Sequence, residues 1–204
     1  MGNDEVVAGA VLLGEPLPVE LMNTVGVGRQ GVHDALEDDA GVAAWLRAVG
    51  DRVGVAAGAP CDGLDEDAVR PVSGRVRSLR DALRRLASEM TSDPRPPATA
   101  PELTRPDAVT ALNAFAGTWP ELVWPSDGPP SRAFRSPDGP ADLAIALIAH
   151  QGVELFAGAQ RRRLRACLAP NCLLFFVAEH ARREWCSALC GNRARVARHY
   201  HRHR

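Results

Sequence analysis

Two short stretches near the C-terminus decide how this chain folds: Cys167-Leu-Ala-Pro-Asn-Cys172 and Cys186-Ser-Ala-Leu-Cys190-Gly-Asn-Arg193. They hold four of the five cysteines of the 204-residue chain. Thiolates bind Zn²⁺ tetrahedrally at about 2.3 Å, and four of them close its coordination sphere. Pro170-Asn171 is a turn signal that lets the first pair converge, and the second pair shares one face of an expected helix that begins near Ser187. The spacing predicts a structural Zn²⁺ site formed by Cys167, Cys172, Cys186 and Cys190.

Such a site leaves no position for water, so the ion stabilises a fold and does not hydrolyse a substrate. His180 is an alternative ligand, and Cys61 is expected to be a core or loop thiol. The first five residues are acidic where a secretory signal is basic, and the apolar run 6–13 is too short to cross a bilayer. We therefore expect a cytoplasmic protein without membrane contact, whose clustered cysteines bind metal and do not form disulfides.

The segment between the cysteine pairs is expected to form a hairpin. Residues 173–177 are a β-branched and aromatic run, residues 178–182 are the expected turn, and residues 183–185 are the expected return strand. Trp185, Phe175 and Phe176 are expected to form the small core of this unit, although they could instead stack on bases. The turn at 167–172, which we call the knuckle, together with the hairpin and the start of the helix, gives a treble-clef-like zinc finger.

Charge is divided unevenly along the chain, and every basic side chain other than His is Arg. Residues 1–159 carry 13 Arg against 23 Asp and Glu, a net charge of −10, whereas residues 160–204 carry 11 Arg against Glu179 and Glu184, a net charge of +9. Arg makes planar, bidentate contacts to phosphate and guanine. The asymmetry therefore predicts a nucleic acid or another polyanion as partner of the basic part.

The predicted nucleic-acid contacts lie after the last cysteine: Asn192, Arg193, Arg195, Arg198 and Arg202. On a helix Arg195, Arg198 and Arg202 share one face, where like charges repel one another unless a polyanion is present. The alternative for this face is a solvated charged surface. Asn192 and Arg193 have a second alternative, which is to brace the metal loop. His199, His201 and His203 belong to the same tail and add charge below neutral pH.

The C-terminal residues resemble the CGNR zinc finger. The resemblance lies in Cys-x4-Cys, Leu174-Phe-Phe176, Arg183-x-Trp-Cys-Ser187 and Cys190-Gly-Asn-Arg-Ala-Arg195. In that family the finger follows a mostly helical ABATE domain, and the proteins are described as stress-induced bacterial transcription regulators. Leu21-Met-Asn-Thr24 and Ala44-Trp-Leu46 are similar to that domain more loosely. Two departures are a second cysteine pair one residue tighter than the family spacing and the turn sequence Ala178-Glu-His180.

The resemblance implies two domains. Residues 1–159 would be an ABATE-like helical domain for sensing or oligomerisation, and residues 160–204 a four-cysteine finger with a basic C-terminal helix. Apolar periodicity predicts helices at 34–49, 65–90, 106–117 and 138–165, with Gly50 ending the first, although 51–57 could add another turn. Residues 17–27 are expected to be a short helix or strand, 91–101 a linker, and 121–124 and 132–135 two strands. The fold class is mainly α with a few short strands.

The helical part contains no nucleophile–base pair, phosphate loop or metalloprotease motif, so an enzyme is not expected. Asn23, Arg80 and His150 are expected to be satisfied structural groups, residues 37–39 to start a helix, and Trp45, Trp119 and Trp124 to be core or pocket residues. We expect a DNA-binding transcription regulator that uses Zn²⁺ and could self-associate or bind an unknown small-molecule inducer. The alternatives are a zinc-dependent protein-interaction module, which could dock an acidic partner or the chain's own acidic domain, and a thiol switch that ejects zinc on oxidation.

Overall fold

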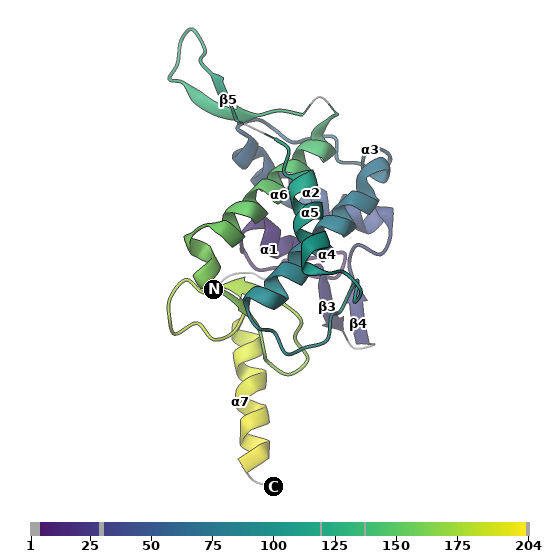
Figure 1. Cartoon of the computed structure of the whole chain (residues 1–204), viewed down its shortest axis with the longest axis vertical. Coiled ribbons are helices and arrows are strands. Elements are labelled where there is room, and N and C mark those ends of the chain that lie inside the picture. The colour runs from purple at the N-terminus through teal and green to yellow at the C-terminus, as the bar shows by residue number, and fades with distance from the viewer. Residues whose placement is uncertain (1–4, 29–30, 119, 137, 203–204) are drawn as a thin grey trace.

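The computed structural model describes residues 5–28, 31–118, 120–136 and 138–202. Helices dominate this part of the chain, and its strands form four separate two-stranded antiparallel pairs. Figure 1 shows a compact body of helices from which α7 projects at one end, while the β5–β6 hairpin extends from the other. The predicted fold class, mainly α with a few short strands, is confirmed. Among the described residues, no helix is both long and apolar enough to cross a bilayer.

The elements, in chain order, are β1 (Glu5–Val7), β2 (Ala10–Leu12), α1 (Leu17–Met22), β3 (Val25–Gly28), β4 (Gly31–Asp34), α2 (Asp39–Ala57), α3 (Glu66–Val69), the 3-10 turn η1 (Arg70–Val72), α4 (Ser73–Met90), α5 (Arg105–Phe115), β5 (Pro120–Val123), β6 (Ser131–Phe134), α6 (Pro140–Ala157), the 3-10 turn η2 (Ala159–Arg162), β7 (Leu164–Ala166), β8 (Phe175–Val177) and α7 (Ala188–Arg202).

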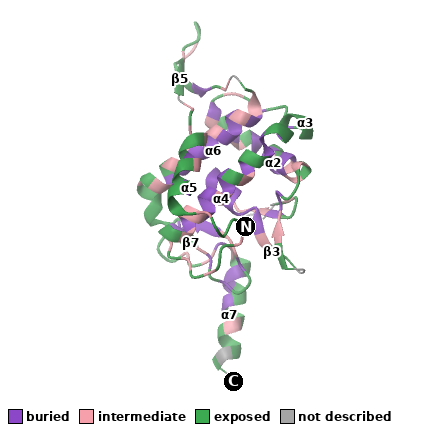
Figure 2. Ribbon diagram, turned by 45° about the vertical axis from the view of Figure 1, so that its right-hand side comes forward, coloured by how far each residue is buried: buried purple, intermediate pink, exposed green. Residues whose placement is uncertain are grey.

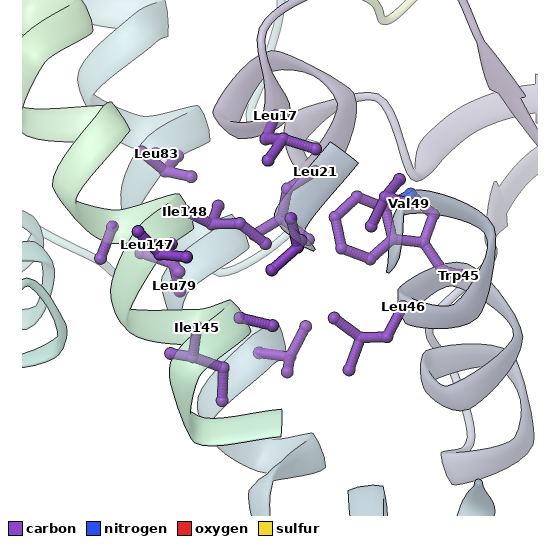
Figure 3. Packing of buried hydrophobic residues seen from close by; sticks show 14 of the residues in the cluster. Leu17, Leu21, Trp45, Leu46, Val49, Leu79, Leu83, Ile145, Leu147 and Ile148 are labelled. Carbon is purple, nitrogen blue, oxygen red and sulfur yellow. The ribbon is translucent and has the colours of Figure 1, made fainter. Parts of the chain in front are cut away.

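The main core lies between α1, α2, α4 and α6. Figure 3 shows Leu21, Trp45, Leu79 and Leu147 pointing toward one another from these four helices, and all four side chains are buried. In α4 the apolar residues recur at three- and four-residue steps and form one stripe that faces this core, whereas all six residues of α1 are buried. Figure 2 shows the same division, with buried residues on the inner faces and exposed residues outside.

Helix α2 differs from its prediction at both ends. It begins after Asp38, whose side chain accepts the backbone N–H of Gly41 at 2.7 Å, as an N-cap should. The expectation that Gly50 ends the helix is wrong, and the alternative that residues 51–57 continue it is confirmed, because α2 runs to Ala57 and ends at Gly58, which has a φ of 70°. A Cβ at Gly50 would lie 3.4 Å from the carbonyl oxygen of Cys61, which is an ordinary van der Waals contact, so packing alone does not require glycine there.

Several other predicted elements are corrected in detail. Residues 17–27 form α1 and then β3, so Gly26 lies inside a strand. The helix predicted at 138–165 ends at Ala157, and residues 164–166 form β7. Trp45 is a core residue as expected, but Trp124 is exposed, and Trp119 lies outside the described residues. Arg80 pairs with Asp34 and Asp81, which confirms its structural role.

Strand β8 has a different partner from the one expected. It pairs with β7, in the register Leu164↔Val177 and Ala166↔Phe175, and not with residues 183–185. Because side chains alternate across a strand, Phe175 and Val177 join the main core while Phe176 packs with the cysteines. β8 thus belongs to both cores, and the division at residues 159 and 160 stays a prediction.

Candidate metal centre

The four C-terminal cysteines converge in space. Their sulfur atoms all lie within 4.8 Å of one another, and all four residues are buried. The Sγ–Sγ distance is 3.8 Å between Cys172 and Cys186 and 3.4 Å between Cys186 and Cys190. A zinc ion with four sulfurs at about 2.3 Å requires sulfur–sulfur distances of about 3.8 Å, whereas a disulfide requires about 2 Å. The sulfurs are therefore spaced to hold zinc and do not form disulfides.

Local backbone structure brings the two pairs together. Asn171 adopts a left-handed φ of 56°, which Asn tolerates better than most residues, and Cys172 N–H donates to the Ala169 carbonyl at 3.1 Å. On the helix side, Ser187 Oγ accepts the N–H of Cys190 at 3.3 Å, as predicted for a residue near the N-cap. His180, the alternative ligand, is exposed and lies outside the cluster.

Electrostatics in the cluster favour a cation. Hydrogen bonds from the thiols of Cys172 and Cys186 lower the pKa of Cys167 to about 2. The hydrogen bond to Cys167 is also the main reason that the pKa of Cys172 rises to about 12 and that the pKa of Cys186 is raised. Without a metal, Cys167 is therefore favoured as the thiolate, while Cys172 and Cys186 remain protonated and donate to it. A divalent cation gives every thiolate a positive neighbour and so favours ionisation of all of them.

Arg193 braces the metal centre. Its guanidinium donates to Cys190 Sγ at 2.8 Å and to the Asn171 carbonyl at 3.1 Å, which joins the helix side of the site to the knuckle. Such outer contacts hold metal ligands in place. The bracing role that was the alternative for Arg193 therefore has direct support. Asn192 accepts a hydrogen bond from Arg195, and within the described residues its side chain makes no hydrogen bond to a sulfur.

Helix α7 carries three predicted nucleic-acid contacts away from the body (Figure 1). Arg195, Arg198 and Arg202 are exposed and fall within about 60° of one another around the helix. None of them has an ion-pair partner among the described residues. The opposite face carries three exposed apolar side chains, namely those of Leu189, Val196 and Tyr200. Nothing is described for the side chain of His201 or for His203.

Most arginines of the helical part, unlike those of α7, form ion pairs in the part of the chain that the structure describes. Eight of those described there form ion pairs with Asp or Glu: Arg52, Arg70, Arg75, Arg77, Arg80, Arg85, Arg95 and Arg105. In the described part of residues 160–204, only Arg183 does so, with Glu15 at 2.6 Å. Within the described residues, most arginines of the finger therefore have no carboxylate in an ion pair with them.

Several polar side chains of the helical part hold the finger, among them those of Asn23, Arg95 and Glu15. Asn23 forms two hydrogen bonds with the backbone of Phe175, from Nδ2 to the carbonyl at 3.0 Å and from the N–H to Oδ1 at 2.8 Å. Arg95 donates to the carbonyls of Cys167 and Cys172 at 2.9 and 2.6 Å, so the expected linker is anchored to the knuckle. Glu15 accepts the N–H of Val177 at 2.9 Å, and burial raises its pKa.

Of Asn23, Arg95 and Glu15, sequence reasoning singled out only Asn23, as a satisfied structural group, and the structure confirms that role. Cys61 is likewise a buried loop thiol, with its sulfur 3.6 Å from the Pro140 carbonyl oxygen. Glu15 and Arg95 were missed. Their partners lie far along the chain, and no local sequence signal distinguishes them from ordinary surface residues.

Comparison with protein families agrees with this geometry. Residues 15–159 match the ABATE family, whose description is "Putative stress-induced transcription regulator". Residues 163–203 match the CGNR zinc finger. No curated protein matches the chain. The first match covers well over half of the chain, so the protein belongs to the ABATE family and ends in a zinc-binding CGNR finger.

Proposed function

We propose that this protein is a DNA-binding transcription regulator in which zinc fixes the direction of α7 and the arginines of α7 contact duplex DNA. One observation carries the proposal. Arg195, Arg198 and Arg202 lie exposed on one face of a projecting helix, and the chain supplies no carboxylate partner for them in the described part. Clustered cations without partners are an electrostatic footprint for a polyanion.

The dimensions of α7 suit this role. Its 15 residues span about 22 Å, and an α-helix with its side chains is about 10–12 Å across. The major groove of DNA is about 12 Å wide and admits such a helix. Cys167, Cys172, Cys186 and Cys190 would hold zinc, which supplies folding free energy and orientation at this closed site. Arg193 then serves the metal centre, while the arginines beyond it remain available to phosphates and bases.

The helical part would supply sensing or self-association. We propose no enzymatic role for it, since the buried polar groups described above are satisfied by the fold. A small-molecule inducer and a homo-oligomer both remain proposals.

A second candidate function is protein interaction through α7. Leu189, Val196 and Tyr200 are 67%, 55% and 69% exposed and fall within about 40° of one another on the helix. A partner could bury this stripe while the basic face stays free. Replacing Val196 and Tyr200 by Gln would then abolish partner binding and leave DNA binding intact. Docking of α7 on the chain's own acidic part has no support, because α7 points away from the body (Figure 1).

The test uses zinc-loaded full-length protein and a fluorescent pool of random duplexes. Binding is measured by anisotropy from 50 to 200 mM salt for the wild type and for the helix variant Arg195→Gln, Arg198→Gln, Arg202→Gln. Gln preserves helix propensity, and loss of three phosphate contacts should lower the slope of log K against log salt by about 2.7. Equal slopes for the two proteins, or no salt-sensitive binding by the wild type, would contradict the proposal.

A further inference from the structure

A surface hollow of about 400 Å³ lies where the end of α4 meets η2 and β7. Arg161, Arg162 and Arg165 line one side, and residues 90–92 line the other. No carboxylate of the described residues lines it. The two acidic residues that flank 90–92 in sequence are already paired, Glu89 with Arg85 and Arg105 and Asp93 with Arg95. The hollow is therefore strongly cationic, and no nearby carboxylate of the described residues neutralises its arginines.

Each of the three arginines has N–H donors that are not used in hydrogen bonds within the described residues. Arg161 donates to the carbonyls of Ala157 and Gly158 and so caps the end of α6, and Arg165 donates to the carbonyls of Arg162 and Leu164. Each guanidinium has five N–H donors, so both retain further ones. The side chain of Arg162 has no hydrogen-bond or ion-pair partner within the described residues. Helix capping explains Arg161, but it does not explain why three arginines gather here.

The hollow is joined to α7 through the metal centre. Arg165 lies two residues before Cys167, a separation of at most about 7 Å along the backbone. The sulfur of Cys167 lies within 4.8 Å of the sulfur of Cys190, which belongs to the first turn of α7. Figures 1 and 2 show α7 leaving the body at the end that carries β7. The metal centre therefore holds the two basic surfaces close together.

We propose that this hollow is a second phosphate-contact site for the duplex that α7 binds. The inference rests on the proposed function and extends it. Duplex DNA carries one negative charge for about every 1.7 Å of its axis, so a helix held in a groove always has backbone phosphates beside it. Arg161, Arg162 and Arg165 would contact these phosphates and fix the register of α7 without reading sequence.

The experiment adds two variants to the anisotropy assay. The hollow variant carries Arg161→Gln, Arg162→Gln and Arg165→Gln, and the control variant loses three exposed arginines near the opposite end, Arg70→Gln, Arg132→Gln and Arg135→Gln. Each is checked for bound zinc and for its circular dichroism spectrum. We expect the hollow variant to lower the salt slope by about 2.7, so that the wild-type advantage in affinity shrinks about 40-fold between 50 and 200 mM salt. The control variant should keep the wild-type slope.

Arg162→Gln alone keeps the proposal testable if the triple variant does not fold, and its expected slope change is about 0.9. A hollow variant with the wild-type slope, together with a helix variant that loses binding, would overturn this inference and leave the proposed function standing. Absence of salt-sensitive binding by the wild type would overturn both. Binding of inorganic pyrophosphate that needs these arginines, with DNA binding unchanged, would instead assign the hollow to a small phosphorylated ligand.

Discussion

Asn23 offers the sharpest test of how the finger is held by the helical part. The Asn23 side chain and Phe175 are each only 2% exposed, so water cannot replace the two hydrogen bonds between them. Asn23→Ala leaves a buried N–H and a buried carbonyl of Phe175 without partners. Each unsatisfied group costs about 1–3 kcal/mol, so we expect the free energy of unfolding to fall by about 2–6 kcal/mol, a large share of the stability of an ordinary domain.

The assay is urea unfolding followed by circular dichroism with excess zinc present. Asn113→Ala is the matched control, because Asn113 is exposed on α5 and its loss should change stability by no more than about 0.5 kcal/mol. The reasoning is refuted if Asn23→Ala unfolds within about 0.5 kcal/mol of the wild type.

Three further predictions concern the metal centre and a buried carboxylate. Arg193→Ala should weaken zinc binding about 10- to 100-fold, measured by competition with a chromogenic chelator, and wild-type affinity would argue against bracing. Cys61→Ser should keep one zinc per chain by elemental analysis, whereas Cys190→Ser should lose tight binding; equal zinc contents would contradict the ligand set. Burial raises the pKa of Glu20 above its ordinary 4.5, so the folded state holds this proton more tightly than the unfolded state does. The stabilising effect of protonation is complete below about 4.5 and is lost as pH rises through the folded pKa. The unfolding free energy of the wild type minus that of Glu20→Gln should therefore fall with rising pH over that window, and a flat or rising difference would contradict it.

The features that could be predicted from the sequence are local ones. The spacing of Cys167, Cys172, Cys186 and Cys190 predicts zinc because ligands close in sequence can converge through one turn and one helix start. Helix periodicity and the cap at Asp38 are local in the same way. These signals were sufficient for the fold class and the identity of the ion.

The features that could not be predicted depend on contacts between distant residues. Residues 175–177 read as a strand, but nothing local states that the strand pairs with β7 or that Phe175 and Phe176 face different cores. The contact between Asn23 and Phe175 spans 152 positions. Gly50 reads as a helix terminator, but α2 continues through it to Ala57. In each case tertiary packing decides between two locally acceptable structures.

The central claim is that zinc orients α7 for DNA, and one titration tests it directly. Zinc is removed stepwise from the full-length protein with a chelator, and the bound metal and the affinity for duplex DNA at about 100 mM salt are measured in the same samples. The account predicts that DNA affinity falls in proportion to zinc loss and returns when zinc is restored. Metal-free protein that binds the duplex as tightly as the zinc form would contradict it.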